Sequence, residues 1–190
     1  MTLHFFKEFN FYAEITGFKK ICAEQATAYL KDNRKNKQQH IWIQFFNSNL
    51  IATPKHLYFA TLHALYAFKN HTNLSKSLAM ETLLYASTQH QIQKAIQTIG
   101  LKPDMTEMAI TIISENKHQI TATLNDISQS LQTDPCDAVL DLTPNKTSQI
   151  QQTFNITPSM IQATIKNRET TDLALVNLMT EKIALLATKF

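Results

Sequence analysis

Apolar and polar positions alternate in residues 9–18, where apolar side chains occupy every second position. This two-residue period predicts a half-buried strand, and Gly17 near its end predicts a turn. Residues 40–52 are rich in β-branched and aromatic side chains and predict a second strand. Residues 107–116 and 138–142 have a similar character, so the pattern predicts about four strands.

Elsewhere, apolar residues recur at spacings of three and four, the period of an amphipathic helix. Thr-Pro pairs at residues 53–54, 143–144 and 157–158 predict helix starts, since Thr is a good N-cap and Pro suits the first helical position. Helices are expected over residues 20–31, 55–69, 78–86, 92–99, 122–131, 145–154 and 172–190. The chain is therefore predicted to form one α+β domain over residues 1–190. Its small, mostly antiparallel sheet of about four strands should pack against six or seven helices that cover mainly one face.

A polar run, Ser87–Gln91, separates two apolar helical segments. Thr88 and Gln91 have the spacing of a capping box, in which Thr88 would begin the second helix. Gly100 would end that helix in the left-handed conformation. These local rules account for the break without a binding site.

Three donor-rich side chains near this break are not used by the capping box. They are Gln89, His90 and Lys94. A helix N-terminus carries free amides and a partial positive charge, so it suits an anion. The three side chains therefore form a candidate site for phosphate or for the edge of an unpaired base.

The charge distribution supports a phosphate-bearing partner for the N-terminal half. Residues 1–102 hold 12 Lys/Arg against 5 Asp/Glu, a net charge of +7, whereas residues 103–190 hold 6 against 10, a net charge of −4. A positive field attracts phosphates, although an ordinary solvated basic face has the same composition. The chain has only 2 glycines, which excludes the glycine-rich phosphate loops of common nucleotide-binding enzymes.

Membrane and metal-binding signals are weak. No apolar run approaches the roughly 20 residues of a membrane span, and the N-terminal residues do not resemble a secretory signal. Cys22 and Cys136 are expected to be two buried thiols in a reducing cytoplasm. His56 and His63 are seven residues apart without a third ligand at suitable spacing, so neither a metal site nor a cofactor is expected.

The segments FNSNLIATPKHLYFATLHALYAFK, SLAMETLLYASTQHQIQKAIQTIG and TEKIALLATK resemble the PRPK-binding-protein family, the small subunit of the KEOPS complex. The matching positions are Asn47, His56, Ser77, Glu81, Leu83, Ala86, Ser87, Gln89, Gln91, Ile92, Gly100 and residues 181–185. Two positions depart from the family pattern: Thr88 replaces a Gly and His90 replaces an Arg. The first change is expected to be mild, because Thr and Gly are both accepted at an N-cap. The second is not, because Arg is always charged and His is mostly neutral at pH 7.

The resemblance implies a non-catalytic subunit that binds the PRPK-type kinase/ATPase of KEOPS, the complex that makes threonylcarbamoyladenosine in tRNA. It also implies capture of the single-stranded 3′ CCA end of tRNA, by a cytoplasmic protein that is monomeric when alone. The expected tRNA-binding residues are Lys55, His56, Ser87, Gln89, His90, Gln91 and Lys94. Two alternatives stay open: a kinase-binding scaffold without RNA binding, and a free-standing enzyme, for which the sequence offers no nucleophile elbow or paired carboxylates.

Several other residues are ambiguous from sequence. Tyr58, Tyr66 and Tyr85 are possible base-stacking platforms, but the first two fit the edge of a core better. His63 on an apolar helix fits a core histidine, and Glu81 is expected to pair with a Lys or to cap a loop. The kinase contact is expected to be apolar. The helix of residues 55–69 and the C-terminal helix are the candidates for it.

Overall fold

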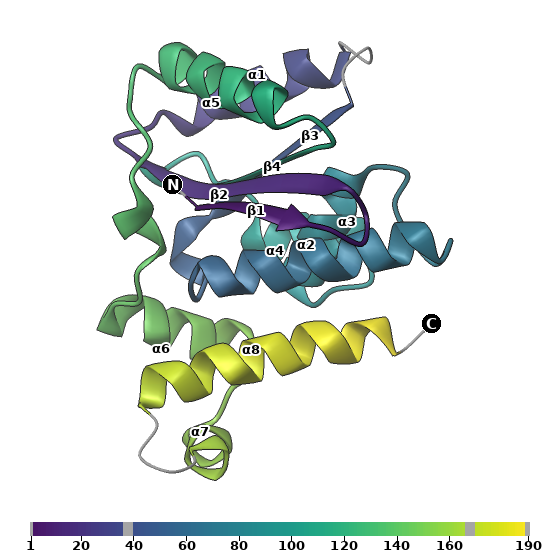
Figure 1. Cartoon of the computed structure of the whole chain (residues 1–190). Helices are drawn as coiled ribbons and strands as arrows, with labels where there is room; N and C mark the ends of the chain where they lie inside the picture. The colour runs from purple at the N-terminus through teal and green to yellow at the C-terminus, as the bar shows by residue number, and fades with distance from the viewer. Residues whose placement is uncertain (1, 36–39, 166–169, 189–190) are drawn as a thin grey trace.

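The computed structural model describes residues 2–35, 40–165 and 170–188. Its centre is a four-stranded antiparallel sheet with strand order β1-β2-β4-β3 (Figure 1). The strands are β1 (Thr2–Phe6), β2 (Phe11–Lys19), β3 (Ile41–Asn47) and β4 (Glu107–Ser114). The predicted α+β class is thus confirmed.

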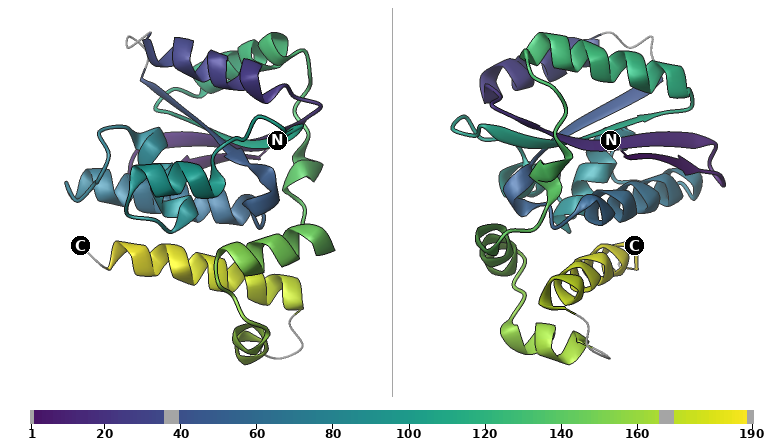
Figure 2. Two further views of the ribbon diagram at one scale, coloured as in Figure 1. Left: turned by 180° about the vertical axis from the view of Figure 1, so that it is seen from behind. Right: turned by 60° about the vertical axis from the view of Figure 1, so that its left-hand side comes forward.

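Helices cover both faces of this sheet, so the expectation that they cover mainly one face is wrong (Figure 2). On one face lie α1 (Ala23–Lys35) and α5 (Lys117–Leu131). On the other lie α2 (Pro54–Lys69), α3 (Leu78–Ser87) and α4 (Ile92–Ile99), which follow the short 3₁₀ helix η1 (Ser48–Leu50). Beyond α2 is an outer layer of α6 (Pro144–Thr153), α7 (Pro158–Thr164) and α8 (Thr171–Ala187).

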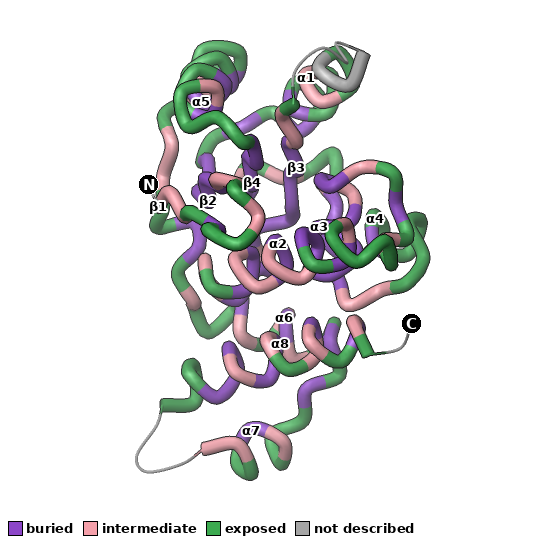
Figure 3. Tube along the Cα trace, turned by 45° about the vertical axis from the view of Figure 1, so that its right-hand side comes forward, coloured by how far each residue is buried: buried purple, intermediate pink, exposed green. Residues whose placement is uncertain are grey.

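Alternate side chains of the strands fill two separate cores. Along β4, Ile110 and Ile112 face α1 and α5, whereas Ala109 and Ile113 face α2 and α3. All four are at most 1% exposed, and the buried trace runs through the middle of the molecule (Figure 3). A sheet that is buried on both faces carries apolar residues at both alternating positions. The pattern of a half-buried strand therefore understated how deeply β2 is covered.

The four strands are not the four that the pattern predicts. The pattern missed β1, which pairs with β2 from Thr2↔Ile15 to Phe6↔Phe11. Residues 138–142 do not form a strand; the chain there forms the 3₁₀ helix η2 (Asp137–Leu140). Thr16 Oγ1 donates to Asp137 Oδ1 at 2.6 Å, which holds η2 against the end of β2.

Gly17 lies inside β2, so the predicted turn at this position is wrong. A Cβ atom at Gly17 would stand 2.7 Å from Cβ of Val139, closer than side chains pack. The backbone N–H of Cys136 also donates to Gly17 O at 2.7 Å. Gly17 therefore allows η2 to approach the strand closely, while the turn between β1 and β2 lies at residues 7–10.

The predicted helix starts are largely confirmed. Pro54, Pro144 and Pro158 each begin a helix. The hydroxyls of Thr143 and Thr157 accept hydrogen bonds from helix N–H groups, as N-caps do. The described residues form eight α-helices rather than six or seven, and α5 starts earlier than expected because Asn116 caps it.

The C-terminal apolar stripe packs into the core. Val176, Met179, Ile183 and Leu186 are buried, whereas Phe190 lies outside the described residues. The helix predicted over residues 20–31 corresponds to α1, which begins at Ala23 and extends through Lys35, and residues 36–39 lie outside the described part.

Both cysteines are free thiols, but Cys22 is exposed and Cys136 half-buried, so the expectation of two buried thiols is wrong. In the described ranges, no group of three or more His, Cys, Asp or Glu side chains is arranged to hold a metal. None of the described helices is long and apolar enough to cross a membrane.

Candidate functional site at the junction of α3 and α4

Thr88 ends α3 instead of starting α4. Its φ and ψ are 54° and 32°, the left-handed conformation. The Thr88 N–H donates to Tyr85 O at 3.0 Å and the Gln89 N–H donates to Leu84 O at 3.1 Å. These two bonds form a Schellman motif, a common helix C-terminus, so the predicted capping box is wrong.

The same geometry bears on Thr88, which stands where the resemblance to the family expects a Gly. A residue at the left-handed end of a helix is usually Gly, because a Cβ atom is disfavoured there, most of all in a β-branched residue. The substitution is therefore costly, not mild. The expectation rested on the N-cap position, whereas Thr88 occupies a C-terminal one.

The start of α4 presents an uncompensated positive end. Its N-cap is Gln91, whose side chain makes no capping bond, and its first turn contains no acidic residue. His90, Gln91 and Lys94 are all exposed here. Lys94 adds its charge to the positive end of the helix macrodipole, an arrangement that disfavours cations and favours an anion.

Gly100 follows α4 without adopting the predicted left-handed conformation. Its φ and ψ are −69° and 166°, an extended geometry. A Cβ atom at this position would lie 2.4 Å from the carbonyl oxygen of Ile96. Gly100 is therefore required by the close approach of the chain to the last turn of α4.

His56 is buried and joins the start of α2 to the end of α3. Its Nδ1 accepts a hydrogen bond from the Ala52 N–H at 3.2 Å, so Nε2 carries the proton that it donates to Ala86 O at 2.8 Å. Burial lowers the pKa of His56 to about 4, so the ring is neutral at pH 7. The residue holds the chain immediately before Ser87 in place.

The predicted tRNA-binding residues thus divide into two groups. His56 and Ser87 are 0% and 0% exposed, and Ser87 Oγ donates to Leu84 O at 3.0 Å. They support the junction from inside and do not reach solvent. The junction's outer side is formed by the exposed His90, Gln91 and Lys94 with half-buried Gln89, and exposed Lys55 lies one residue before His56.

The three tyrosines make ring contacts within the fold. Tyr85 is 3% exposed and stacks on His63 at 5.7 Å, and burial raises its pKa to about 12. Tyr58 stacks on Phe6 at 5.0 Å. Tyr66 lies near the other end of α2. These placements fit the reading of core and core-edge residues.

The sequence analysis did not predict that two apolar side chains on α4 would be exposed. Ile92 and Ile96 are 40% and 47% exposed, whereas Ala95 and Ile99 of the same helix are fully buried. The spacing of all four residues indicates one apolar stripe, but a helix this short at the edge of the layer buries only half of it. The sequence signal that could have revealed them is the width of the apolar stripe, which is greater than packing against one neighbouring element requires.

Glu81 has a structural role, as expected. Its carboxylate accepts hydrogen bonds from the backbone N–H groups of Leu74 at 3.2 Å and Ser75 at 2.7 Å. It thereby caps the loop between α2 and α3. Burial raises the pKa of Glu81, while these two bonds from Ser75 and Leu74 oppose the shift.

Comparison with known proteins gives two matches. A family model described as "Kinase binding protein CGI-121" matches residues 18–187. The chain is also similar to "Regulatory protein Cgi121" of Methanocaldococcus jannaschii, with 32% identity over 113 residues, covering 60% of this chain and 70% of the relative. The family match includes the whole α3–α4 junction.

Proposed function

We propose that this chain, which belongs to the CGI-121 family of kinase-binding proteins, is a non-catalytic KEOPS subunit that recruits tRNA. In this proposal it binds the PRPK-type kinase/ATPase and captures the single-stranded 3′ CCA end of tRNA substrates for threonylcarbamoyladenosine formation. The observation that carries the tRNA part is the exposed cluster of His90, Lys94 and the uncapped start of α4.

The chemistry of this cluster suits a single-stranded end. A phosphate would accept hydrogen bonds from Lys94, from His90 and from the first N–H groups of α4. Ile92 and Ile96 add an exposed apolar surface on the same helix, against which unpaired bases can pack. Single-stranded nucleic acids are bound by this combination of cationic groups and apolar surface.

The test uses labelled tRNA, intact or trimmed of its 3′ CCA, at a fixed moderate salt concentration. We expect trimming to weaken binding strongly. We also expect the His90→Ala/Lys94→Ala double variant to bind intact tRNA about tenfold more weakly or worse, because two phosphate contacts are lost. Equal affinity for both tRNAs, or an unchanged double variant, would contradict the proposal.

The chain offers a matched control on another helix. Lys117 and His118 are also an exposed Lys and His at a helix start, that of α5. The Lys117→Ala/His118→Ala variant removes the same groups from the opposite face of the sheet. It should bind tRNA like the unmodified protein, and thermal unfolding of all variants checks that the fold is intact.

The kinase contact is proposed at the outer helical layer. The apolar character of α2 is accounted for by its position between the sheet and α8. The outer helix α8 instead leaves Leu173 and Leu185 40% and 49% exposed. Leu185 lines a hollow of about 250 Å³ between α7 and α8, together with Met160 and Leu178.

A kinase-binding scaffold without RNA binding is the second candidate function. His90 at a position where the resemblance expects an Arg favours it, because an imidazole lacks the fork of donors with which a guanidinium holds phosphate. His90→Arg separates the two candidates. It should tighten binding to intact tRNA if His90 faces phosphate, and leave it unchanged in a scaffold that has no RNA site.

A further inference from the structure

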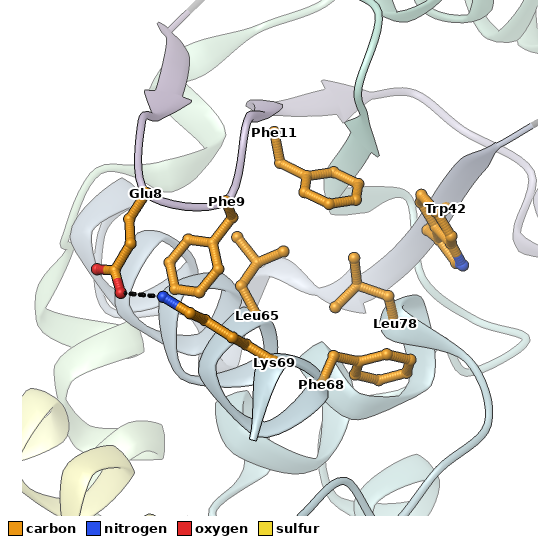
Figure 4. A pocket seen from close by; sticks show the side chains of 8 residues that line it. All are labelled: Glu8, Phe9, Phe11, Trp42, Leu65, Phe68, Lys69 and Leu78. Carbon is orange, nitrogen blue, oxygen red and sulfur yellow. Dashed lines mark hydrogen bonds and ion pairs between the residues drawn. The ribbon is translucent and has the colours of Figure 1, made fainter. Parts of the chain in front are cut away.

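A second hollow of about 440 Å³ lies at the opposite end of α2 from the α3–α4 junction. We refer to it as the aromatic cavity; it is lined by Glu8, Phe9, Phe11, Trp42, Leu65, Phe68, Lys69 and Leu78 (Figure 4). His56 stands at the start of α2 and Lys69 at its end, which separates the two sites by roughly 20 Å along the helix. Neither the proposed RNA site nor the α7–α8 hollow includes these residues.

The walls of this cavity are aromatic and incompletely covered. Leu65 and Leu78 are 3% and 2% exposed, whereas Phe9, Phe11 and Trp42 are only half-buried. Phe11 and Trp42 meet edge to face, with ring centroids 5.6 Å apart. Aromatic rings favour such offset and edge contacts with a further ring, so the space suits a planar aromatic group.

A single ion pair stands at one end of the cavity, across from Trp42 (Figure 4). Lys69 Nζ lies 2.6 Å from Glu8 Oε1, and Tyr66 Oη donates to Glu8 Oε2 at 2.7 Å. The hydrogen bond from Lys69 and that from Tyr66 lower the pKa of Glu8, so it is a carboxylate at pH 7. Both charged side chains are about half exposed, at 50% for Lys69 and 49% for Glu8.

We propose that the aromatic cavity binds a free aromatic α-amino acid. Its ring lies among Phe9, Phe11 and Trp42, its carboxylate pairs with Lys69, and its ammonium pairs with Glu8. A cavity of this size, with apolar walls and a few convergent polar groups, has the form of a small-molecule site.

Charge complementarity selects the free amino acid over related ligands. The end of the cavity that holds Lys69 and Glu8, its mouth, presents one positive and one negative group side by side. A zwitterion can form an ion pair with each of them. An aromatic residue inside a protein chain carries neither charge. A C-terminal residue carries only the carboxylate, and an N-terminal residue only the ammonium.

The test is a titration of the full-length protein with L-phenylalanine, followed by tryptophan fluorescence. Trp42 is the single tryptophan of the sequence, so the signal reports on the cavity wall alone. We expect a saturable change. Phenylalanine amide lacks the carboxylate and 3-phenylpropionate lacks the ammonium, and each should bind about tenfold more weakly or worse.

Variants at the mouth provide a second arm. Lys69→Met and Glu8→Gln should each weaken L-phenylalanine binding about tenfold, as the loss of the ligand's own charge does. Lys69→Arg keeps the positive charge and should retain most of the affinity. Lys117→Met, on a distant helix, is the control and should leave the affinity unchanged. Equal affinity for all three ligands would mean that neither Lys69 nor Glu8 contributes to binding, and it would overturn the proposal. The absence of a saturable response would also overturn the proposal. If Trp42 is then shielded when the kinase is added, the cavity is a kinase-docking site instead.

Discussion

Thr88 and His56 shape the α3–α4 junction through the backbone that they hold. Thr88 accepts a left-handed conformation that lets α3 end in a Schellman motif. His56 ties Ala52 to Ala86 and thereby fixes the last turn of α3 against the start of α2. The exposed side chains of the candidate site depend on this backbone, so both residues can be tested through stability.

Replacing Thr88 with Gly should stabilise the protein. The left-handed conformation costs an L-residue about 1–2 kcal/mol, and Gly avoids most of that cost. We expect Thr88→Gly to raise the free energy of unfolding by about 1 kcal/mol, measured by urea denaturation. Thr98→Gly, in the last turn of α4, is the control and should lower it by roughly 0.3 kcal/mol, because Gly has a lower helix propensity than Thr. A loss of stability in Thr88→Gly would contradict the strain argument.

The buried ring of His56 should make stability depend on pH. Its pKa is about 4 in the folded protein because of burial, against about 6.5 in an unfolded chain. The unfolded state therefore binds a proton first as the pH falls. The stability from neutral His56 is complete above pH 6.5 and is lost progressively down to about pH 4, by about 3 kcal/mol in total.

This pH dependence can be measured by urea denaturation of the unmodified protein and of His56→Gln at pH 7, 5.5 and 4. The variant should be less stable at pH 7, since it loses well-placed hydrogen bonds, but its stability should fall less on acidification. Exposed His118 is the control, because His118→Gln should follow the unmodified protein. If the free energy of unfolding fell by the same amount on acidification in His56→Gln and in the unmodified protein, the assignment of this pH dependence to His56 would be wrong.

At the scale of elements, α4 and α8 differ in what they leave uncovered. Both helices have an apolar stripe, but α4 exposes Ile92 and Ile96 beside cationic groups, and α8 exposes Leu173 and Leu185 at the molecule's outer edge. The first surface suits bases and phosphates. The second suits an apolar protein partner, in which a few buried side chains carry most of the binding energy.

Replacing Leu185 with Asp tests the α8 surface. A charge at the centre of an apolar contact should weaken binding to the kinase about tenfold or more, measured by calorimetry with the purified kinase. Leu74, 43% exposed in the loop after α2, is the control, and Leu74→Asp should bind normally. Unchanged binding by a folded Leu185→Asp would move the kinase contact elsewhere.

For the whole molecule, the charge is distributed unevenly along the chain. The net charge of +7 over residues 1–102 belongs to the strands β1 to β3 and the helices α1 to α4, which contain the candidate RNA site. The net charge of −4 over residues 103–190 is concentrated in residues 103–143, which form β4, α5 and η2 and hold 1 Lys/Arg against 7 Asp/Glu. Residues 144–190, which include α6 to α8, hold 5 Lys/Arg against 3 Asp/Glu. Long-range attraction therefore draws a polyanion towards the positive N-terminal residues, which include α4.

The sequence by itself determined the period of each segment and therefore most of the elements. Apolar spacing located the helices and Thr-Pro pairs located three helix starts. Alternation located β2, and β-branched and aromatic composition located β3 and β4. These features depend on residues within a few positions of each other, so local rules suffice. The motif of residues 77–100 likewise identified the family.

Only the tertiary structure decided which groups face solvent and which alternation becomes a strand. The segment predicted as a strand over residues 138–142 instead contributes to η2 (Asp137–Leu140), because Thr16 binds Asp137 from 121 positions away and Gly17 admits Val139. His56 can be buried because the carbonyl oxygen of Ala86, 30 positions on, accepts a hydrogen bond from its Nε2–H group. Ile92 stays exposed because none of the described helices and strands covers that side of α4. Burial is a property of contacts between distant segments, and spacing along the chain does not encode which segments meet.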